Sequence, residues 1–378
     1  DGWATFKNDY EMLDPVIADI ATRGLGFGVH LIITATRYTE MRPALRDQIL
    51  SRLELRLGDA MESEFDRKRA ENVPMGKPGR GLSPEKLDYL AATPRIDGST
   101  QVEDLADGMA HLVQSVNSAW QGPTAPKVRM LPTMLHASEL PGGGDFGSRG
   151  IAVGVDELTL SPVFVDFETD PLFVIYGESE SGKSSLLRFM AKQISERYAP
   201  NKALFVVSDF RRALLGQVPE SHMYKYCASG PQLQEVMESL AGSMSRRMPG
   251  PDVTPDQLRN RSWYSEPDAF IFIDDYDLVA TSMGNPMSVL LEYLPFARDL
   301  GLRIILARST SGASRSSFEP VLTRIKELGA QGIVLSGDPS EGPVFNNIKA
   351  TPQPQGRGQF ISRRSSGQLV QTGYLPES

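Results

Sequence analysis

The sequence has little cysteine and histidine and no long apolar run. Its single cysteine, Cys227, excludes an intramolecular disulfide framework and a cysteine-cluster metal site in this 378-residue chain. The four histidines are scattered and show no metal-ligand spacing. No apolar run reaches the roughly 18 residues of a membrane-spanning helix, and no secretory signal is recognisable. We therefore expect the chain to work in the reducing cytoplasm.

An excess of positive charge is also lacking. Thirty-nine Lys and Arg residues against 47 Asp and Glu residues give a net charge of −8. This balance argues against a surface that coats nucleic acid, although it does not exclude a local basic patch. The apolar fraction of 40% and the charged fraction of 23% are ordinary for a globular protein. Because domains average about 150 residues, we expect more than one domain.

A weak internal repeat divides the chain. Four short segments recur in the same order: Asp1–Trp3 with Asp274–Tyr276, Gly28–Ala35 with Gly301–Ala307, Leu57–Asp59 with Ser336–Asp338, and Gly79–Gly81 with Gly356–Gly358. Only the second copy has a long N-terminal half. We therefore predict that residues 1–118 are the C-terminal half of one domain and that residues 119–378 form a complete second domain. The segment Trp120–Pro126 has the composition of a linker.

The clearest motif is Gly177–Ser184, which fits the phosphate-binding pattern G-x-x-x-x-G-K-[ST] at every fixed position. The apolar run Leu172–Tyr176 predicts a buried strand before it, and the periodicity of Ser185–Ile194 predicts a helix after it. We expect the next strand at Ala203–Val207. In this arrangement the loop N–H groups and the helix N-terminus bind phosphate oxygens, which predicts ATP as the ligand.

Each residue type in the loop has a chemical reason. Lys183 would place its charge against the β- and γ-phosphates, and the Ser184 hydroxyl would ligate Mg²⁺. We expect the side chains of Glu178 and Glu180 to point to solvent, because two negative charges would oppose phosphate binding. The predicted ATP-contacting residues are Gly177, Glu178, Ser179, Glu180, Ser181, Gly182, Lys183, Ser184 and Ser185.

The run Phe270–Asp275 consists of four apolar residues followed by two carboxylates. We predict a strand beside the phosphate-loop strand, with Asp274 binding Mg²⁺ through water and Asp275 acting with Lys183 in catalysis. Glutamate is common where Asp275 stands as the base, and the shorter aspartate predicts better binding than hydrolysis. Two carboxylates that merely cap a turn are the structural alternative. In the first copy, Gly2 occupies the position of the base, where glycine has no side chain to act.

An arginine supplied by a neighbouring domain often completes a site of this kind. Arg52, at the start of a strand expected within the run Ile49–Leu55, is a candidate for this role, and Gln331 replaces it in the second copy. A solvated or salt-bridged arginine is an equally good interpretation, and Arg46 and Arg56 are competing candidates.

Together these features resemble the FtsK/SpoIIIE ATPases and, more specifically, the EccC ATPases of type VII (ESX) secretion. The resemblance is carried by Asp1–Trp3, by the expected strand Leu31–Arg37, by Leu45–Asp59, by Gly76–Gly81 and by the phosphate loop. It implies an α/β fold of tandem P-loop NTPase domains with parallel sheets of the RecA/FtsK type. The chain would hold the tail of the second ATPase domain and the whole third domain.

The resemblance also implies a function and partners. The chain would be an ATP- and Mg²⁺-binding module of a secretion motor, which couples nucleotide binding to domain docking and recognises the C-terminal export signals of WXG-type substrates. Its partners would be other ATPase domains of the motor and, through an upstream region or another subunit, an inner-membrane secretion complex. It would lie in the cytoplasm beside that membrane and bind no nucleic acid.

Hydrolysis in this part of the motor is expected to be weak, since the later ATPase domains of the family are degenerate, in agreement with Gly2 and Asp275. Two alternatives stay open at this point. A DNA translocase of the same superfamily is one, and a substrate-binding scaffold with a vestigial phosphate loop is the other.

Overall fold

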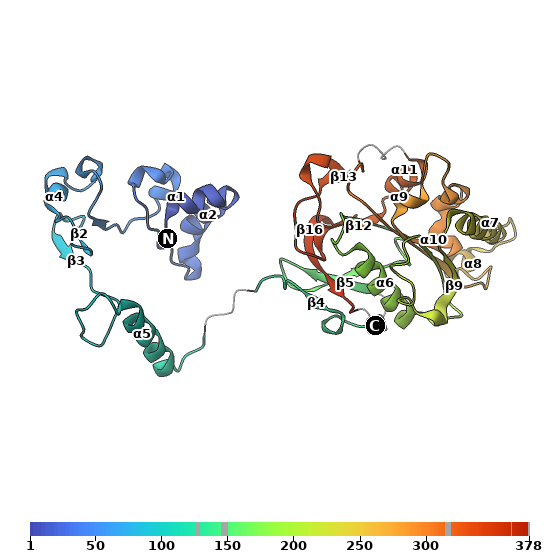
Figure 1. The fold of residues 1–378 in the computed structure, drawn as a ribbon, viewed down its shortest axis with the longest axis horizontal. Coiled ribbons are helices and arrows are strands. Elements are labelled where there is room, and N and C mark those ends of the chain that lie inside the picture. The colour runs from blue at the N-terminus through green and yellow to red at the C-terminus, as the bar shows by residue number, and fades with distance from the viewer. Residues whose placement is uncertain (125–128, 145–149, 314–318, 364, 377–378) are drawn as a thin grey trace. The chain divides into compact units, whose positions relative to one another are not determined.

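The computed structural model describes residues 1–124, 129–144, 150–313, 319–363 and 365–376 (Figure 1). The chain divides into two compact units, Asp1–Ala125 and Pro126–Ser378, here called unit 1 and unit 2. Among the described residues, no helix combines the length and the hydrophobicity needed to cross a lipid bilayer.

Unit 1 is a small assembly of short elements. A three-stranded antiparallel sheet has the order β1-β2-β3. Its strands are β1 (Glu54–Leu55), β2 (Arg80–Leu82) and β3 (Asp88–Leu90), and its α-helices are α1 (Trp3–Asp9), α2 (Asp14–Arg23), α3 (Pro43–Arg46), α4 (Arg67–Asn72) and α5 (Leu105–Ala119). Short 3-10 turns join them at Glu11–Leu13, Gly24–Phe27, Tyr38–Glu40 and Ala60–Glu62.

The strand expected over Leu31–Arg37 is absent from unit 1, and that expectation is wrong. The segment has no regular secondary structure, and the Ile32 side chain is 89% exposed. In unit 2 the matching segment, β11 (Leu302–Arg308), pairs with a strand on each side. A strand needs partners for its backbone N–H and C=O groups, and none of the described residues of unit 1 forms a strand beside this segment. The strand expected to begin at Arg52 is present only as the two-residue β1, which pairs with β2.

Unit 2 is built on one large mixed sheet whose order is β6-β5-β16-β15-β12-β7-β11-β10-β8-β9, with β4 beside β16. The half from β12 to β9 is parallel, and the half from β15 to β6 is antiparallel. Its strands are β4 (Leu135–His136), β5 (Ile151–Asp156), β6 (Pro162–Val165), β7 (Leu172–Tyr176), β8 (Ala203–Asp209), β9 (Met223–Cys227), β10 (Asp268–Asp274), β11, β12 (Gln331–Val334), β15 (Arg357–Ser362) and β16 (Ser365–Tyr374). A separate pair is formed by β13 (Pro343–Phe345) and β14 (Ile348–Lys349).

Helices cover both faces of the parallel half (Figure 1). On one face α6 packs against alternate strand residues such as Phe173, Phe205 and Ile305. On the other face α7 and α11 cover residues of the opposite parity such as Val174 and Ile304. The α-helices of unit 2 are α6 (Lys183–Arg197), α7 (Gly230–Arg247), α8 (Pro255–Asn260), α9 (Tyr276–Val279), α10 (Ala297–Leu300) and α11 (Pro320–Glu327). Burial on both faces explains why the parallel strands are almost uniformly apolar in sequence.

The order of the strands corrects one expectation. The acidic strand β10 is not the neighbour of the phosphate-loop strand β7, because β11 pairs with both and lies between them. A strand that is buried on both faces has the same apolar sequence pattern at any position in a sheet. The pattern therefore does not indicate which strands are its neighbours. The strand expected at Ala203–Val207 is confirmed as part of β8.

The internal repeat has a structural counterpart. The antiparallel order β1-β2-β3 of unit 1 matches the order β12-β15-β16 of unit 2. Gly2 and Asp275 both precede a helix in the left-handed region, at φ 66° and 53°. Asp59 and Asp338 each accept a hydrogen bond from the N–H two residues later, at 2.8 Å in both cases. The two copies therefore share local geometry as well as residue types.

Candidate nucleotide-binding site

The loop Gly177–Ser184 connects the C-terminal end of β7 to the N-terminus of α6, as the motif requires. Gly182 has φ 103°, which favours glycine, and it precedes the first helical residue, Lys183. An added Cβ on Gly177 would collide with the Ser181 hydroxyl, which itself donates to the Glu178 carbonyl at 2.8 Å. The loop is therefore a tight turn that leaves no room for side chains at its glycines.

Lys183 lies half-buried at the start of α6, and its ammonium donates to the Glu178 carbonyl at 2.8 Å. Burial lowers the pKa of Lys183, and the carboxylates of Asp275 and Asp274 oppose that shift. The lysine thus places a cation among three acidic groups, the third being Asp277. A phosphate group at this loop would meet that cation together with the helix N-terminus.

Ser184 and Asp274 are 90 residues apart in sequence and meet directly. The Ser184 hydroxyl donates to Asp274 Oδ2 at 2.6 Å. Burial raises the pKa of Asp274 to about 6, although the bond from Ser184 opposes the shift. The other oxygen, Oδ1, is buried and has no hydrogen-bond partner among the described residues. A hydroxyl next to an unsatisfied buried carboxylate oxygen fits the needs of Mg²⁺, which prefers oxygen ligands.

The two loop glutamates behave differently from each other. Glu180 is exposed, as expected, and it has a left-handed backbone at φ 62°. Glu178 does not simply point to solvent, because its carboxylate accepts a hydrogen bond from the Asp338 N–H at 3.0 Å. The Glu178 carboxylate is therefore held by the loop after β12. Ser179 is exposed, and Ser185 lies half-buried in the first turn of α6.

Asp275 follows β10 and precedes α9 in the left-handed region. Its carboxylate forms an ion pair with Arg211 in the loop after β8, at 3.0 Å from Arg211 Nε. The structure therefore brings Lys183, Ser184, Asp274 and Asp275 to the same edge of the sheet. It also gives Asp275 a cationic partner that sequence analysis did not identify.

Asp209, at the end of β8, is a second buried acid that sequence analysis missed. It stands opposite Asp274 in the β8–β10 register. Its Oδ2 accepts hydrogen bonds from the Leu214 N–H at 2.6 Å and from the Tyr226 hydroxyl at 2.7 Å, while its Oδ1 is buried without a partner among the described residues. The available signal was an apolar run that ends in a carboxylate, as at Asp274.

Arg308, at the end of β11, was also missed. Its guanidinium is buried and donates to Asp277 at 2.7 Å, and its carbonyl accepts a hydrogen bond from the Gly177 N–H at 3.1 Å. Because β11 lies between β7 and β10, this arginine stands between the phosphate loop and the acidic strand. A charged residue directly after an apolar strand was the signal in the sequence.

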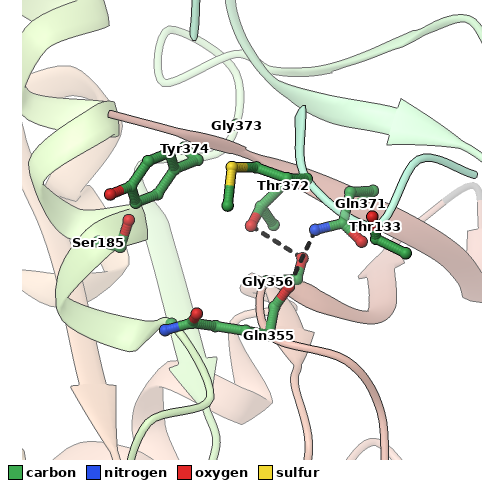
Figure 2. Close-up of a pocket in the computed structure, with 10 residues that line it drawn as sticks. Thr133, Ser185, Gln355, Gly356, Gln371, Thr372, Gly373 and Tyr374 are labelled. Carbon is green, nitrogen blue, oxygen red and sulfur yellow. Dashed lines mark hydrogen bonds between the residues drawn. The ribbon is translucent and has the colours of Figure 1, made fainter. Parts of the chain in front are cut away.

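A hollow lies beside the phosphate loop (Figure 2). Gly182 and Ser185 form its wall on the side of the loop and α6, and Gln355 and Gly356 form a turn against them. The remaining wall comes from the end of β16 and from Thr133 and Met134. This hollow therefore adjoins the phosphate loop.

Arg52, the candidate arginine finger, belongs to unit 1. Its guanidinium donates to the carbonyls of Ile49 at 3.0 Å and Arg46 at 3.1 Å, and it lies 4.7 Å from the centre of the Tyr38 ring. In unit 2, Gln331 donates to Asp170 at 2.7 Å at the start of β12. The start of β12 and the phosphate loop lie at opposite edges of the parallel sheet, so this position does not reach the loop of its own unit.

No protein-family model matches the chain. It is 47% identical, over 374 residues, to the ESX secretion system protein EccC of Thermomonospora curvata and 40% identical, over 377 residues, to the ESX-4 secretion system protein EccC4 of Mycobacterium tuberculosis. The matches cover 99% and 100% of this chain but 28% and 29% of those relatives. The chain therefore spans less than a third of their length.

Among solved structures, one of Thermomonospora curvata EccC (ATPases 2 and 3) in complex with a signal sequence peptide matches with a TM-score of 0.82 and 46% sequence identity. The match covers all of this chain and 68% of that one. The expected α/β architecture of tandem ATPase domains is thereby confirmed.

Proposed function

Because the chain belongs to the EccC family of type VII secretion ATPases, we propose that unit 2 is a Mg²⁺·ATP-binding module of a secretion motor. In this proposal nucleotide occupancy controls how the module docks with other domains and how it holds an export substrate. The DNA-translocase alternative loses its support, since these relatives are secretion proteins.

The observation that carries the proposal is the contact between Ser184 and Asp274 at 2.6 Å. It joins the phosphate loop to the acidic strand across the intervening β11, and the buried Asp274 Oδ1 stays available to a metal-bound water. Lys183 would neutralise the β- and γ-phosphates, and the N–H groups of the loop would orient them. Bound Mg²⁺ supplies charge neutralisation for the phosphates.

We assign slow hydrolysis to this module. A general base must reach the attacking water, and Asp275 has a short side chain whose carboxylate is already paired with Arg211 at 3.0 Å. The same pairing keeps negative charge away from the γ-phosphate, which favours binding. ATP would therefore stay bound to this module without being hydrolysed for longer than it would in an efficient motor domain.

We further propose that unit 1 is the C-terminal half of a second ATPase domain and that unit 2 is a third ATPase domain. The support is the internal repeat, together with the match of both units to a structure of ATPases 2 and 3. Arg52 would act as an arginine finger toward a neighbouring domain, after release from its carbonyl contacts in unit 1. The module would work on the cytoplasmic side of an inner-membrane complex, beside other ATPase domains.

The export substrate is the second part of the proposal. Thermomonospora curvata EccC has been solved with a signal sequence peptide, and this chain matches that structure along its whole length. We propose that unit 2 binds C-terminal export signals of WXG-type proteins. Titration with a peptide of such a C-terminus should show saturable binding, and a scrambled peptide should show none. Equal binding of both peptides would overturn this part.

Calorimetric titration of Mg²⁺·ATP tests the nucleotide proposal directly. We expect saturable binding to the unaltered chain and loss of binding in Lys183→Ala, with very slow phosphate release in the unaltered chain. Lys192→Ala, on the same helix but paired with Glu196, is the matched control and should bind normally. No binding by the unaltered chain would leave a scaffold with a vestigial loop, and rapid phosphate release would show an active motor domain.

A further inference from the structure

The segment that leads into unit 2, residues 129–144, is bound to the core of that unit. Leu131, Leu135 and Leu140 are buried, and β4 pairs in parallel with the end of β16. Farther along, the Gln193 side chain on α6 donates to the Pro141 carbonyl at 3.2 Å, and an added Cβ on Gly143 would collide with the Gln193 carbonyl. This lead-in segment therefore spans from β16 to α6, the helix that begins at the phosphate loop.

Arg357 forms hydrogen bonds to the start of the lead-in segment. Its Nη2 donates to the carbonyls of Pro132 at 2.8 Å and Leu131 at 3.2 Å. Its Nε donates to the Gln371 side-chain oxygen at 3.1 Å. A single half-buried guanidinium thus holds two backbone carbonyls of the lead-in segment and one side chain of β16.

From Gln371 the contacts continue to the phosphate loop. Its amide donates to the Gln355 carbonyl at 3.0 Å, and the Thr372 hydroxyl donates to the Gly356 carbonyl at 2.9 Å (Figure 2). The Gly356 N–H in turn donates to the Ser181 carbonyl at 2.9 Å.

The turn formed by Gln355 and Gly356 is also packed tightly against the loop. Gly356 has φ 72°, and a Cβ on Gly182 would lie 3.1 Å from the Gly356 nitrogen. The backbone of this turn therefore lies directly against the phosphate loop.

The residues that follow Leu131 and Pro132 line the hollow beside the phosphate loop. Thr133 and Met134 line it together with Gly182 and Ser185. They are exposed in the structure, with Met134 at 50%. A nucleotide that extends from the phosphate loop into this hollow would contact the lead-in segment and the loop at the same time.

We propose that Arg357 is a positioning residue that couples nucleotide binding in unit 2 to docking of the lead-in segment. The inference rests on the proposed function, because it takes ATP as the ligand of the phosphate loop. Coupling of this kind is reciprocal, so nucleotide should tighten the docked segment and the docked segment should tighten nucleotide.

The chain supplies its own matched control. Arg80 occupies the same place in the Gly-Arg-Gly of unit 1, at the start of β2 as Arg357 is at the start of β15. Arg80 is exposed, whereas Arg357 is half-buried and bonded. Arg80→Ala therefore removes the same side chain from the equivalent position without touching the hollow beside the phosphate loop.

The experiment measures two properties of the full chain and of its Arg357→Ala and Arg80→Ala variants. The first is the dissociation constant for Mg²⁺·ATP, from calorimetry. The second is the rate of trypsin cleavage after Arg129, with and without Mg²⁺·ATP. In Arg357→Ala we expect cleavage without nucleotide to be faster, nucleotide to protect no longer and the dissociation constant to rise about tenfold, within the usual range of coupling. Arg80→Ala should behave as the unaltered chain does.

The outcomes separate this inference from the proposed function. No binding of Mg²⁺·ATP by the unaltered chain overturns both. Binding by the unaltered chain with an equal dissociation constant and equal nucleotide protection in Arg357→Ala overturns the coupling alone. If Arg357→Ala shows a loss of helix content by circular dichroism, Arg357→Lys replaces it, because lysine keeps the charge but cannot make the three-way contact. Lysine that restores both properties fully would also count against the geometric role of the guanidinium.

Discussion

At the scale of single residues, the candidate site depends on atoms whose partners come from distant segments. Asp274 accepts a hydrogen bond from Ser184, which is 90 residues away in the sequence. Asp275, after β10, forms an ion pair with Arg211 in the loop after β8. Both contacts place a carboxylate within a charged cluster that also contains Lys183. The contrast between these neighbours is chemical: Asp274 has an oxygen without a partner among the described residues, whereas Asp275 is held by a cation.

The residue scale carries the first prediction. Asp275→Glu should raise phosphate release at least tenfold, since an added methylene lets the carboxylate reach the water while keeping its charge, and a positioned base contributes about 10²-fold or more. The affinity for Mg²⁺·ATP should change little. A phosphate-release assay with Mg²⁺·ATP checks this, and the Asp275→Glu/Lys183→Ala double variant gives the background rate. Unchanged release in Asp275→Glu would show that the length of the base is not what limits hydrolysis.

At the scale of elements, α6 connects the phosphate loop to the core. Its first residue is the loop lysine, and it packs against β5, β16, β11 and β10, with buried side chains such as Phe189 and Ile194. The Phe189 ring also lies where Gly373 of β16 leaves room, because a Cβ on Gly373 would approach it within 2.5 Å. The helix, the antiparallel strands and the loop are therefore packed as one body.

This packing gives a stability prediction. Phe189→Ala should lower the free energy of unfolding of unit 2 by about 3–5 kcal/mol, the usual cost of removing a fully buried phenylalanine ring. Denaturant unfolding followed by circular dichroism measures it. Leu158→Ala, at a side chain that is 84% exposed, should cost less than about 0.5 kcal/mol. Similar losses in the two variants would contradict the assignment of Phe189 to the core.

At the scale of the whole molecule, the two units differ in how much apolar surface they bury. The large clusters of buried residues lie in unit 2. Among the described residues of unit 1, the buried apolar side chains are Trp3, Leu45, Ala70, Val73 and Leu82. Several of its apolar side chains are exposed instead, including Ile32 at 89% and Leu50 at 85%. A unit with few buried side chains has little free energy to offset the entropy of ordering its chain.

We therefore expect unit 1 to open first. Amide hydrogen exchange of the full chain should be fast throughout α1 to β3 and slowest in β10 and β11, because local opening follows the density of buried contacts. Limited proteolysis should remove unit 1 and leave a stable fragment that begins near Pro126. Protection of β1 and β2 equal to that of β10 would show that unit 1 is stabilised by contacts other than its own core.

A second prediction at this scale concerns alkaline pH. Burial raises the pKa of both Tyr176 and Tyr198 to about 12, whereas a tyrosine in an unfolded chain ionises near pH 10. Between about pH 10 and pH 12, these tyrosines lose their protons in the unfolded state but keep them in the folded state. The contribution of these two tyrosines to the free energy of unfolding should therefore be fully present below about pH 10. It should decrease as the pH rises toward about 12. Denaturant midpoints that stay constant over this range would contradict the burial of these rings.

The local parts of this protein follow from short stretches of its sequence. The phosphate loop, the strand before it and the helix after it depend on residues that are neighbours in the chain, and so do β8, the acidic end of β10 and the internal repeat. Glycine spacing and apolar periodicity encode these features directly. The same patterns supported the family resemblance, which the comparisons confirm.

Which segments meet, in contrast, depends on how the whole chain packs. Three contacts join residues that are far apart in sequence. They are the pairing of β11 with both β7 and β10, the ion pair of Asp275 with Arg211, and the hydrogen bonds of Arg357 to the lead-in segment. The lost strand over Leu31–Arg37 shows the same principle, because its pattern predicts a strand but the described part of unit 1 has no partner strand beside it. A residue pattern specifies which face of an element is apolar, whereas partner and order depend on packing across the whole unit.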